Sequence, residues 1–239
     1  MWLYDRPIAH RGLHDNANTE NSMGAFRNAI EKGYNIETDV HILKSGEVVI
    51  FHDFTLKRVC GKNVKITDLT LDDIKGNDYL LPNGEHIPLL SELLEIAEGK
   101  TGILLEIKIN GFNYDVEKAV LELIKGKEDF IAVQAFNPWT IAWFRQHAPE
   151  FTLGILSDGI ILPVDKMMMK KMRPDFIAYN IKSIGKCTIK YIKKKNLKTL
   201  VWTVRKEELF DKAVSINVDN IIFEHLDPYK YGYHLPSEN

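Results

Sequence analysis

Residues 198–223 read KTLVWTVRKEELFDKAVSINVDNIIF. The run 198–204 is apolar and rich in β-branched side chains, residues 207–215 place apolar side chains at helical spacing, and 220–223 is a second apolar run. A short strand, a helix and another strand in succession are typical of a βαβ unit, in which the two strands lie parallel in one sheet. The stretch therefore predicts an α/β fold built on a parallel sheet.

The same alternation runs back through most of the chain. We expect strands at 8–9, 35–43, 102–109, 130–136, 152–156, 175–181, 198–204 and 220–223, with 48–51 returning antiparallel to 35–43 through a hairpin turn. Helical patterns occupy 22–32, 91–99, 138–147, 166–173, 188–195 and 207–215. Eight such units in 239 residues favour a closed (β/α)₈ TIM barrel over an open doubly wound sheet. The interpretation is one domain spanning residues 1–239.

One stretch, residues 53–90, departs from this rhythm. It is rich in Gly, Pro and Asn and has weak periodicity. A loop of this length in a compact domain is usually functional or a small subdomain. Because it follows the second barrel strand and its hairpin, we expect a small insertion that caps the site, not a separately folding domain.

Composition excludes several classes of protein. The 31 Lys and Arg against 33 Asp and Glu give a net charge of −2, which offers no general attraction to nucleic acid or membrane. Lys-rich runs at 166–173 and 190–198 are interpreted as solvated helix faces. The two cysteines lack CxxC spacing, no run reaches the ~20 apolar residues of a membrane helix, and the first residues do not resemble a signal peptide. We expect a cytoplasmic protein without stable membrane insertion.

Side chains of catalytic type stand at the ends of the early strands. In a TIM barrel the carboxyl ends of all strands meet at one face, which carries the active site. Residues scattered along the sequence would therefore come together there. The residues concerned are His10 and Arg11, Glu37 and Asp39, His52 and Asp53, and Glu106 and Lys108.

Three of these residues, Glu37, Asp39 and Glu106, form a candidate metal site. Carboxylates facing one lumen repel one another and raise each other's pKa unless a cation lies among them. Hard oxygen ligands suit Ca²⁺ or Mg²⁺ better than zinc. The alternative is that the carboxylates pair with Arg11 and Lys108 and hold no metal.

The histidines His10 and His52 are candidates for proton transfer, because imidazole can give and take protons near neutral pH. Arg11 and Lys108 would supply positive charge for an anion such as phosphate. The other six histidines lack such company, a pairing with Arg or Asp beside the carboxylate cluster, and are expected to be structural or exposed. These are His14, His41, His86, His147, His225 and His234.

Motifs along nearly the whole chain resemble those of the glycerophosphodiester phosphodiesterase family, in the same order. They are His10-Arg11-Gly12, Thr19-Glu20-Asn21-Ser22, Glu37-Thr38-Asp39-Val40, His52-Asp53-Phe54-Thr55-Leu56-Lys57-Arg58, Ile87-Pro88-Leu89-Leu90-Ser91-Glu92, Leu105-Glu106-Ile107-Lys108, Gln134-Ala135-Phe136-Asn137-Pro138 and Val201-Trp202-Thr203-Val204. The resemblance implies a (β/α)₈ barrel with a small insertion. It also implies hydrolysis of a small glycerophosphodiester to glycerol 3-phosphate and an alcohol with a divalent cation.

The resemblance also implies roles for individual residues. His10 and His52 correspond to the general acid/base pair, Arg11 and Lys108 to phosphate contacts, and Glu37, Asp39 and Glu106 to the metal ligands. Glu20 and Asn21 correspond to residues bordering the site, with Glu20 a candidate further ligand for metal or glycerol. Trp202 corresponds to an aromatic wall, for which ordinary barrel packing is the alternative. This chain has Thr19 where the family commonly has proline and Ala135 where it commonly has serine. The resemblance therefore does not determine which leaving group the enzyme prefers.

Two other functions are compatible with the same scaffold. The first is a lysophospholipase D-like phosphodiesterase acting on a lipid head group, which exposed aromatic side chains in the cap would support. The second is a non-catalytic barrel that only binds. The complete set of histidines and carboxylates argues against the second function.

Overall fold

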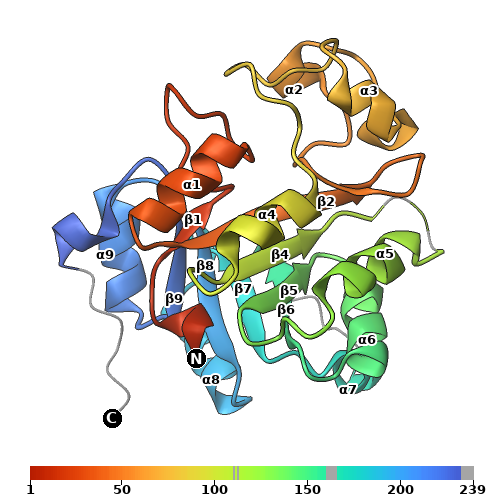
Figure 1. Ribbon diagram of the computed structural model, residues 1–239. Helices are drawn as coiled ribbons and strands as arrows, with labels where there is room; N and C mark the ends of the chain where they lie inside the picture. The colour runs from red at the N-terminus through yellow and green to blue at the C-terminus, as the bar shows by residue number, and fades with distance from the viewer. Residues whose placement is uncertain (110, 112, 160–165, 233–239) are drawn as a thin grey trace.

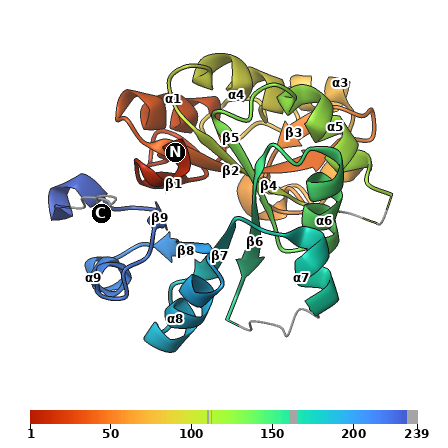
Figure 2. The same ribbon diagram turned by 90° about the horizontal axis from the view of Figure 1, so that it is seen from below.

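Eight parallel strands close into a barrel in the computed structural model, which describes residues 1–109, 111, 113–159 and 166–232. The hydrogen-bonded order is β1-β9-β8-β7-β6-β5-β4-β2, and β1 also pairs with β2, so the ring has no open edge. Figures 1 and 2 show the longer helices outside this ring. The predicted (β/α)₈ barrel is confirmed. The strands are β1 (Ile8–His10), β2 (Asn35–Ile42), β3 (Val48–Ile50), β4 (Ile103–Ile107), β5 (Ile131–Ala135), β6 (Thr152–Ser157), β7 (Phe176–Asn180), β8 (Lys198–Val204) and β9 (Asn220–Phe223).

The helices agree in most places with the periodicity of the sequence. The bounds of α6 and α9 coincide with those predicted, and the others differ by a few residues at their ends. Three helices were not predicted: the short α2 and α3, and α5, although the buried Val116, Val120 and Ile124 of α5 recur at a spacing of four. The helices are α1 (Met23–Glu31), α2 (Lys57–Cys60), α3 (Leu71–Lys75), α4 (Leu90–Ala97), α5 (Asp115–Ile124), α6 (Pro138–His147), α7 (Lys166–Met172), α8 (Lys186–Lys194) and α9 (Glu207–Ser215). The 3₁₀ helices are η1 (Trp2–Tyr4), η2 (Ile66–Asp68) and η3 (Pro228–Tyr231).

The barrel interior is filled by apolar side chains at its amino-terminal end. Leu3, from η1, is fully buried among strand residues such as Leu104, Phe176 and Leu200. The first residues of β2 and β9, Asn35 and Asn220, donate side-chain hydrogen bonds to backbone carbonyls of Trp2, Leu3 and Arg6. The helix η1 therefore closes this end, which leaves the carboxyl end of the strands for a site.

Close packing inside the barrel explains why residue 154 is a glycine. A Cβ atom built on Gly154 of β6 would lie 2.1 Å from the ring of Phe176 on the adjacent strand β7. Real side chains do not approach so closely, so residue 154 has to lack a side chain for Phe176 to fill the interior.

Residues 53–90 form a small subdomain of short helices and loops beside the β2–β3 hairpin, coloured orange to yellow at the top of Figure 1. It contains α2, η2 and α3, and its apolar side chains pack into a cluster separate from the main core. Thr70 caps α3 by accepting a hydrogen bond from the Asp73 backbone N–H, and Asp73 reciprocates. The cluster consists of Leu43, Val49, Phe51, Leu56, Ile66, Leu69, Ile74, Leu81 and Ile87.

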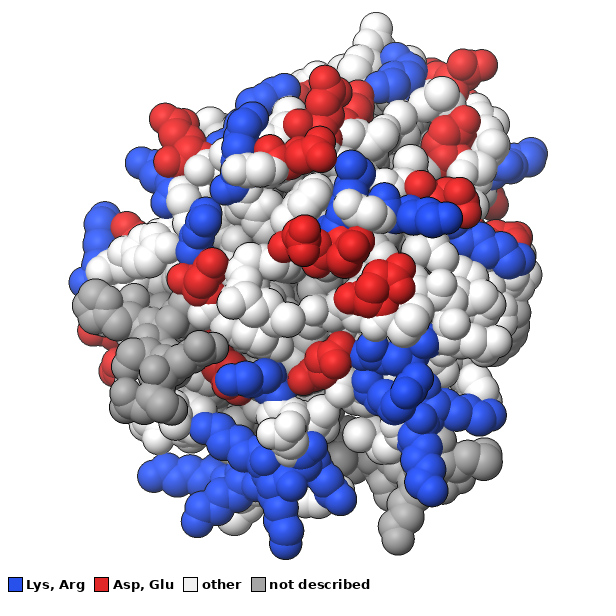
Figure 3. All heavy atoms as spheres, turned by 60° about the horizontal axis from the view of Figure 1, so that its bottom comes forward, with Lys and Arg blue, Asp and Glu red and all other residues white. Residues whose placement is uncertain are grey.

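Charged side chains lie on the outside. In Figure 3, Lys and Arg side chains form two groups toward the bottom of the face, and acidic side chains lie nearer its middle. The lysines of α8 at positions 190, 193 and 194 are exposed, as expected of a solvated helix face. Among the helices of the described residues, none combines the length and the apolar character needed to cross a membrane.

Candidate active site

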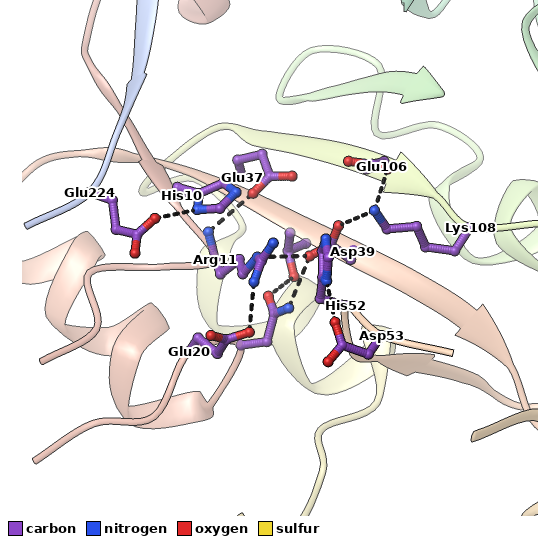
Figure 4. Close-up of polar contacts among 12 residues, drawn as sticks. His10, Arg11, Glu20, Glu37, Asp39, His52, Asp53, Glu106, Lys108 and Glu224 are labelled. Carbon is purple, nitrogen blue, oxygen red and sulfur yellow. Dashed lines mark hydrogen bonds and ion pairs between the residues drawn. The ribbon is translucent and has the colours of Figure 1, made fainter. Parts of the chain in front are cut away.

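Strand register brings the predicted residues together at the carboxyl end of the barrel. His10 on β1 is the pairing partner of Glu37 on β2, and Asp39 on β2 is the partner of Glu106 on β4. Because β1, β2 and β4 are consecutive in the ring, these side chains surround one region of space (Figure 4).

A cavity of about 270 Å³ opens at this place. Seven of the residues predicted for the site line it, together with Phe136 and Arg205, among others. Its size is close to the lower end of the range for small-molecule sites, ~300–1,000 Å³. The seven predicted residues are His10, Arg11, Glu37, His52, Glu106, Lys108 and Trp202.

The three acidic residues form a compact buried group. One carboxylate oxygen from each of Glu37, Asp39 and Glu106 lies within 4.8 Å of the others, and the residues are 2%, 1% and 7% exposed. Burial and the neighbouring carboxylates raise the pKa of Glu37 and of Glu106. Burial would also raise the pKa of Asp39, but Lys108, His52 and Arg11 outweigh it and hold that pKa below its usual range.

Two basic side chains balance this group in part. The Nζ of Lys108 lies 3.0 Å from Asp39 Oδ1 and hydrogen-bonds Glu106, and the Nε of Arg11 lies 3.5 Å from Asp39 Oδ2. With all three carboxylates ionised, the two cations would leave one negative charge in a buried place, and the raised pKa of Glu37 and Glu106 reflects that cost, which a further cation would remove. Three hard oxygen donors with surplus negative charge suit a divalent ion such as Ca²⁺ or Mg²⁺. The residues present therefore fit a divalent metal.

Each candidate acid/base histidine is held by a carboxylate. His10 Nδ1 lies 3.0 Å from Glu224 Oε2, and His52 Nδ1 lies 2.6 Å from Asp53 Oδ1. Because an ionised carboxylate only accepts hydrogen bonds, both rings carry a proton on Nδ1. Burial lowers the pKa of both histidines, so the neutral ring is favoured and Nε2 is left for proton exchange.

A chain of ion pairs joins the first loop to the cap. Arg11 donates from Nη1 to Glu20 Oε1 at 2.8 Å, and Arg58 of α2 donates to both oxygens of Glu20 and to Asp53. Glu20 is thus engaged with two guanidinium groups and is not among the residues lining the cavity. Its position is suited to fixing Arg11.

Asn21 is likewise behind the cavity wall. Its backbone is left-handed (φ 57°), and its buried Nδ2 donates to Asp39 Oδ2 at 3.1 Å, while Thr38 Oγ1 donates to Asn21 Oδ1 at 2.8 Å. Trp202 does line the cavity: its Nε1 donates to the Ala178 carbonyl at 2.9 Å, and its ring meets Phe136 edge-on at 5.7 Å. The two aromatic rings therefore form one side of the cavity.

Asp53 was predicted at the site beside His52 without a role, and two further partners, Arg58 and Glu224, were not predicted. Arg58 lies in the same motif as His52 and Asp53, so proximity in sequence could have indicated it. Glu224 follows β9, and applying the strand-end rule to the last strand as well as the early ones would have found it.

The prediction that His14 and His225 lack acidic company is wrong, because both lie near Glu224. His41 is buried and His86 and His147 are exposed, as predicted, whereas His234 lies outside the described residues.

Comparison with known proteins agrees with the resemblance noted in the motifs. The profile of the glycerophosphoryl diester phosphodiesterase family matches residues 10–228. A glycerophosphodiester phosphodiesterase of Caldanaerobacter subterraneus subsp. tengcongensis is 30% identical over 90% of this chain and 92% of its own length. A human lysophospholipase D is 24% identical over 91% of this chain and 82% of its own. The solved structure of an Oleispira antarctica phosphodiesterase in complex with sn-glycerol-3-phosphate has the same fold (TM-score 0.81, 24% identity, 93% of each chain).

Proposed function

Because the chain belongs to the glycerophosphoryl diester phosphodiesterase family and is thus a hydrolase of phosphodiesters, we propose that it splits small glycerophosphodiesters into glycerol 3-phosphate and an alcohol by acid/base catalysis at His10 and His52. One observation carries the proposal. The two histidines, each oriented by a carboxylate, line the same cavity as Glu37, Glu106, Arg11 and Lys108. The Oleispira structure with sn-glycerol-3-phosphate supports this class of product.

Arg11 and Lys108 bind the phosphoryl group in this proposal. Both are largely buried at the cavity wall, and Asp39 keeps the pKa of each above its ordinary value despite burial. They therefore stay charged when substrate enters. Positive groups fixed beside phosphoryl oxygens stabilise the charge that redistributes in the transition state and need no reorganisation to do so. Glu20, held between Arg11 and Arg58, keeps the guanidinium of Arg11 in place.

Glu37, Asp39 and Glu106 are the residues that would hold a divalent cation, Ca²⁺ or Mg²⁺, supported by Asn21 behind Asp39. When bound, such an ion supplies further positive charge for the phosphoryl oxygens. It would also remove the repulsion that raises the pKa of Glu37 and Glu106.

His10 and His52 move the protons. One histidine stays neutral and removes the proton from the attacking hydroxyl with its free Nε2. The other takes up a proton on Nε2 beside the anionic phosphodiester, becomes an imidazolium, and donates that proton to the departing alkoxide. Two nucleophiles fit this arrangement, a water molecule or the 2-hydroxyl of the glycerol, which would form a cyclic phosphate. Tracing oxygen-18 from water into glycerol 3-phosphate and trapping a cyclic product separate these routes.

The leaving alcohol or the glycerol would pack against Trp202 and Phe136. A flat apolar wall beside a charged site orients a small polar molecule by excluding water from one side. The cap of residues 53–90 is proposed to select among leaving groups, since Asp53 and Arg58 connect it directly to His52 and Glu20.

The two free cysteines, Cys60 and Cys187, are compatible with a cytoplasmic enzyme, and we include that location in the proposal.

The direct test is an assay that detects glycerol 3-phosphate released from glycerophosphocholine, glycerophosphoethanolamine and glycerophosphoglycerol, with and without EDTA. We expect turnover of at least one substrate, lost in chelator and restored by Ca²⁺ or Mg²⁺. Activity unchanged by EDTA would refute the metal requirement, and the absence of glycerol 3-phosphate with all three would refute the substrate class.

A second candidate is lysophospholipase D-like action on a lipid head group. Phe54 in the cap is 47% exposed and Phe136 at the cavity is 48% exposed, so apolar side chains are available near the opening for an acyl chain. Turnover of lysophosphatidylcholine that begins only above its micellar concentration, with no turnover of soluble glycerophosphodiesters, would favour this function over the first.

A further inference from the structure

A second group of metal-ligating side chains lies on the other side of Glu224 from His10. His14 belongs to the loop between β1 and α1, and Glu224 and His225 directly follow β9. Because β1 and β9 are neighbours in the barrel, the loop and the strand end meet. One ligand atom from each of the three residues lies within 4.8 Å of the others.

The individual distances match a small tetrahedral ion. His225 Nε2 lies 2.9 Å and His14 Nε2 lies 3.6 Å from the same oxygen, Glu224 Oε1. Ligands at ~2.0–2.1 Å from a tetrahedral zinc ion are about 3.3 Å apart, and the two distances lie on either side of this value. The other carboxylate oxygen, Oε2, is used by His10 and Arg205, so Oε1 is the one left for an ion.

His14 supplies an independent sign that a partner is missing. Its Nε2 is buried and has no hydrogen-bond partner, since 3.6 Å to Glu224 is too long for one. A buried polar nitrogen without a partner is uncommon in a folded protein and requires an explanation.

The backbone at His225 aims its ring into the group. Successive side chains of an extended strand point to opposite sides, so Glu224 and His225 would diverge if β9 simply continued. His225 has φ 62°, in the left-handed region, and its ring turns back to Glu224 and meets the ring of His14 edge-on at 5.1 Å. A non-glycine residue in this region is uncommon and often marks a site where a side chain has to be placed.

We propose that His14, Glu224 and His225 bind a divalent transition-metal ion of the Zn²⁺ class, at a site separate from the acidic group. Imidazole nitrogens select Zn²⁺, Co²⁺ or Ni²⁺, whereas the three oxygens of Glu37, Asp39 and Glu106 select Ca²⁺ or Mg²⁺. With three protein ligands the ion keeps one position for water. His225 is 57% exposed on its side chain, so the site is accessible from solvent.

The difference in ligand chemistry provides the experiment. The purified chain is saturated with Mg²⁺ to occupy the acidic group and is then titrated with Zn²⁺ by calorimetry and with Co²⁺ by visible absorption. We expect one equivalent of Zn²⁺ to bind and Co²⁺ to show the bands of a tetrahedral complex. Removing even a supporting partner of a metal ligand costs ~10–100-fold in affinity, so loss of a ligand in His225→Asn or His14→Asn should weaken binding at least about tenfold.

The variants distinguish a loss of Zn²⁺ binding from a loss of the fold. His225→Asn keeps a side chain that tolerates the left-handed backbone, and the side chain at this position is exposed, so the fold is expected to persist. His147→Asn, an exposed histidine on α6, and Glu37→Gln, in the acidic group, should both retain Zn²⁺ affinity. Zn²⁺ binding unchanged in both His225→Asn and His14→Asn, or no Zn²⁺ binding by the Mg²⁺-saturated chain, would overturn the site. Neither readout depends on the proposed hydrolysis.

Discussion

Glu224, the residue after the last strand, holds His10, the last residue of the first strand, through a 3.0 Å contact between Oε2 and Nδ1. The carboxylate is itself fixed by Arg205, whose Nε donates to the same oxygen at 2.9 Å. Burial would raise the pKa of Glu224, but the hydrogen bonds from His10 and Arg205 outweigh it and keep the group ionised. This contact sets the tautomer of His10 and leaves Nε2 for the proposed proton transfer.

Replacing Glu224 by Gln should therefore slow the reaction more than it weakens substrate binding. An amide can donate as well as accept, so the ring of His10 is no longer held with its proton on Nδ1. We expect kcat to fall by about 10–100-fold with KM nearly unchanged, as is common when the partner that orients an active histidine is lost. Steady-state kinetics check this. An equal change in KM with constant kcat would show that Glu224 acts on binding, not on His10.

Substituting His10 or His52 by Ala should each reduce kcat by about 10²–10⁴-fold, because a positioned proton donor or acceptor contributes this much. The fold should persist, since neither ring is part of the apolar clusters. His147→Ala is the matched control, because its ring lies on the exposed end of α6 and should leave kcat unchanged. Near wild-type kcat in either active-site variant would remove that residue from the acid/base pair.

Addition of Ca²⁺ or Mg²⁺ should raise the melting temperature. An ion that binds only the folded chain stabilises it by about 2.7 kcal/mol at a concentration 100 times its Kd. Glu106→Gln, which removes one charge from the acidic group, should reduce this rise, whereas Glu98→Gln, outside the group, should not. Thermal unfolding with and without ion measures both. A melting temperature insensitive to both ions in the wild-type chain contradicts the proposed metal site.

The fold was predictable because its determinants are local. A short apolar run, a turn and an amphipathic helix recur along the chain, and the barrel follows from repeating that unit. The helix α5 shows the limit of such local signals: its buried face is regular, but a turn-rich stretch precedes it and interrupts the alternation of strands and helices. The position of the cap could be predicted from the sequence, but its helices could not. The elements α2, η2 and α3 are too short to give a periodic signal, and they depend on one shared apolar cluster.

The site was predictable where one strand end carries two polar residues, as with Glu37 and Asp39. Partners separated by long stretches of sequence were not. Glu224 is 214 positions from His10, and the pair forms only because β9 returns to β1 when the barrel closes. Arg58 reaches Glu20 across 38 positions, which requires the cap to fold back over the first loop. Local patterns could place Glu224 and Arg58 near the site, but the residue that each contacts depends on the neighbours that closure creates.

Removing the cap should leave a folded barrel with altered preference among leaving groups. The cap packs on Leu43, Val49 and Phe51 of the β2–β3 hairpin, so a shortened chain that joins residue 53 to residue 87 also needs polar residues at the newly exposed positions. Loops at this face vary in barrel enzymes while the barrel persists. We expect the ratios of kcat/KM among choline, ethanolamine and glycerol esters to become more equal. A folded variant that keeps the wild-type ratios would show that selectivity lies with Trp202, Phe136 or the first loop.

The packing of the cap can be followed through Cys60, at the end of α2. Burial raises the pKa of its thiol from 9.0 to about 11, whereas Cys187 on α8 is exposed. The thiolate is the reactive form, so at pH 8 only about 0.1% of Cys60 would be available to iodoacetamide. In a Cys187→Ser variant we expect slow labelling of Cys60 that accelerates about tenfold for each pH unit between 8 and 10. Denaturant should abolish this protection. Labelling of the folded variant at pH 8 as fast as in denaturant would mean that α2 does not shield the thiol, and the cap would then be too loosely packed to border the site as proposed.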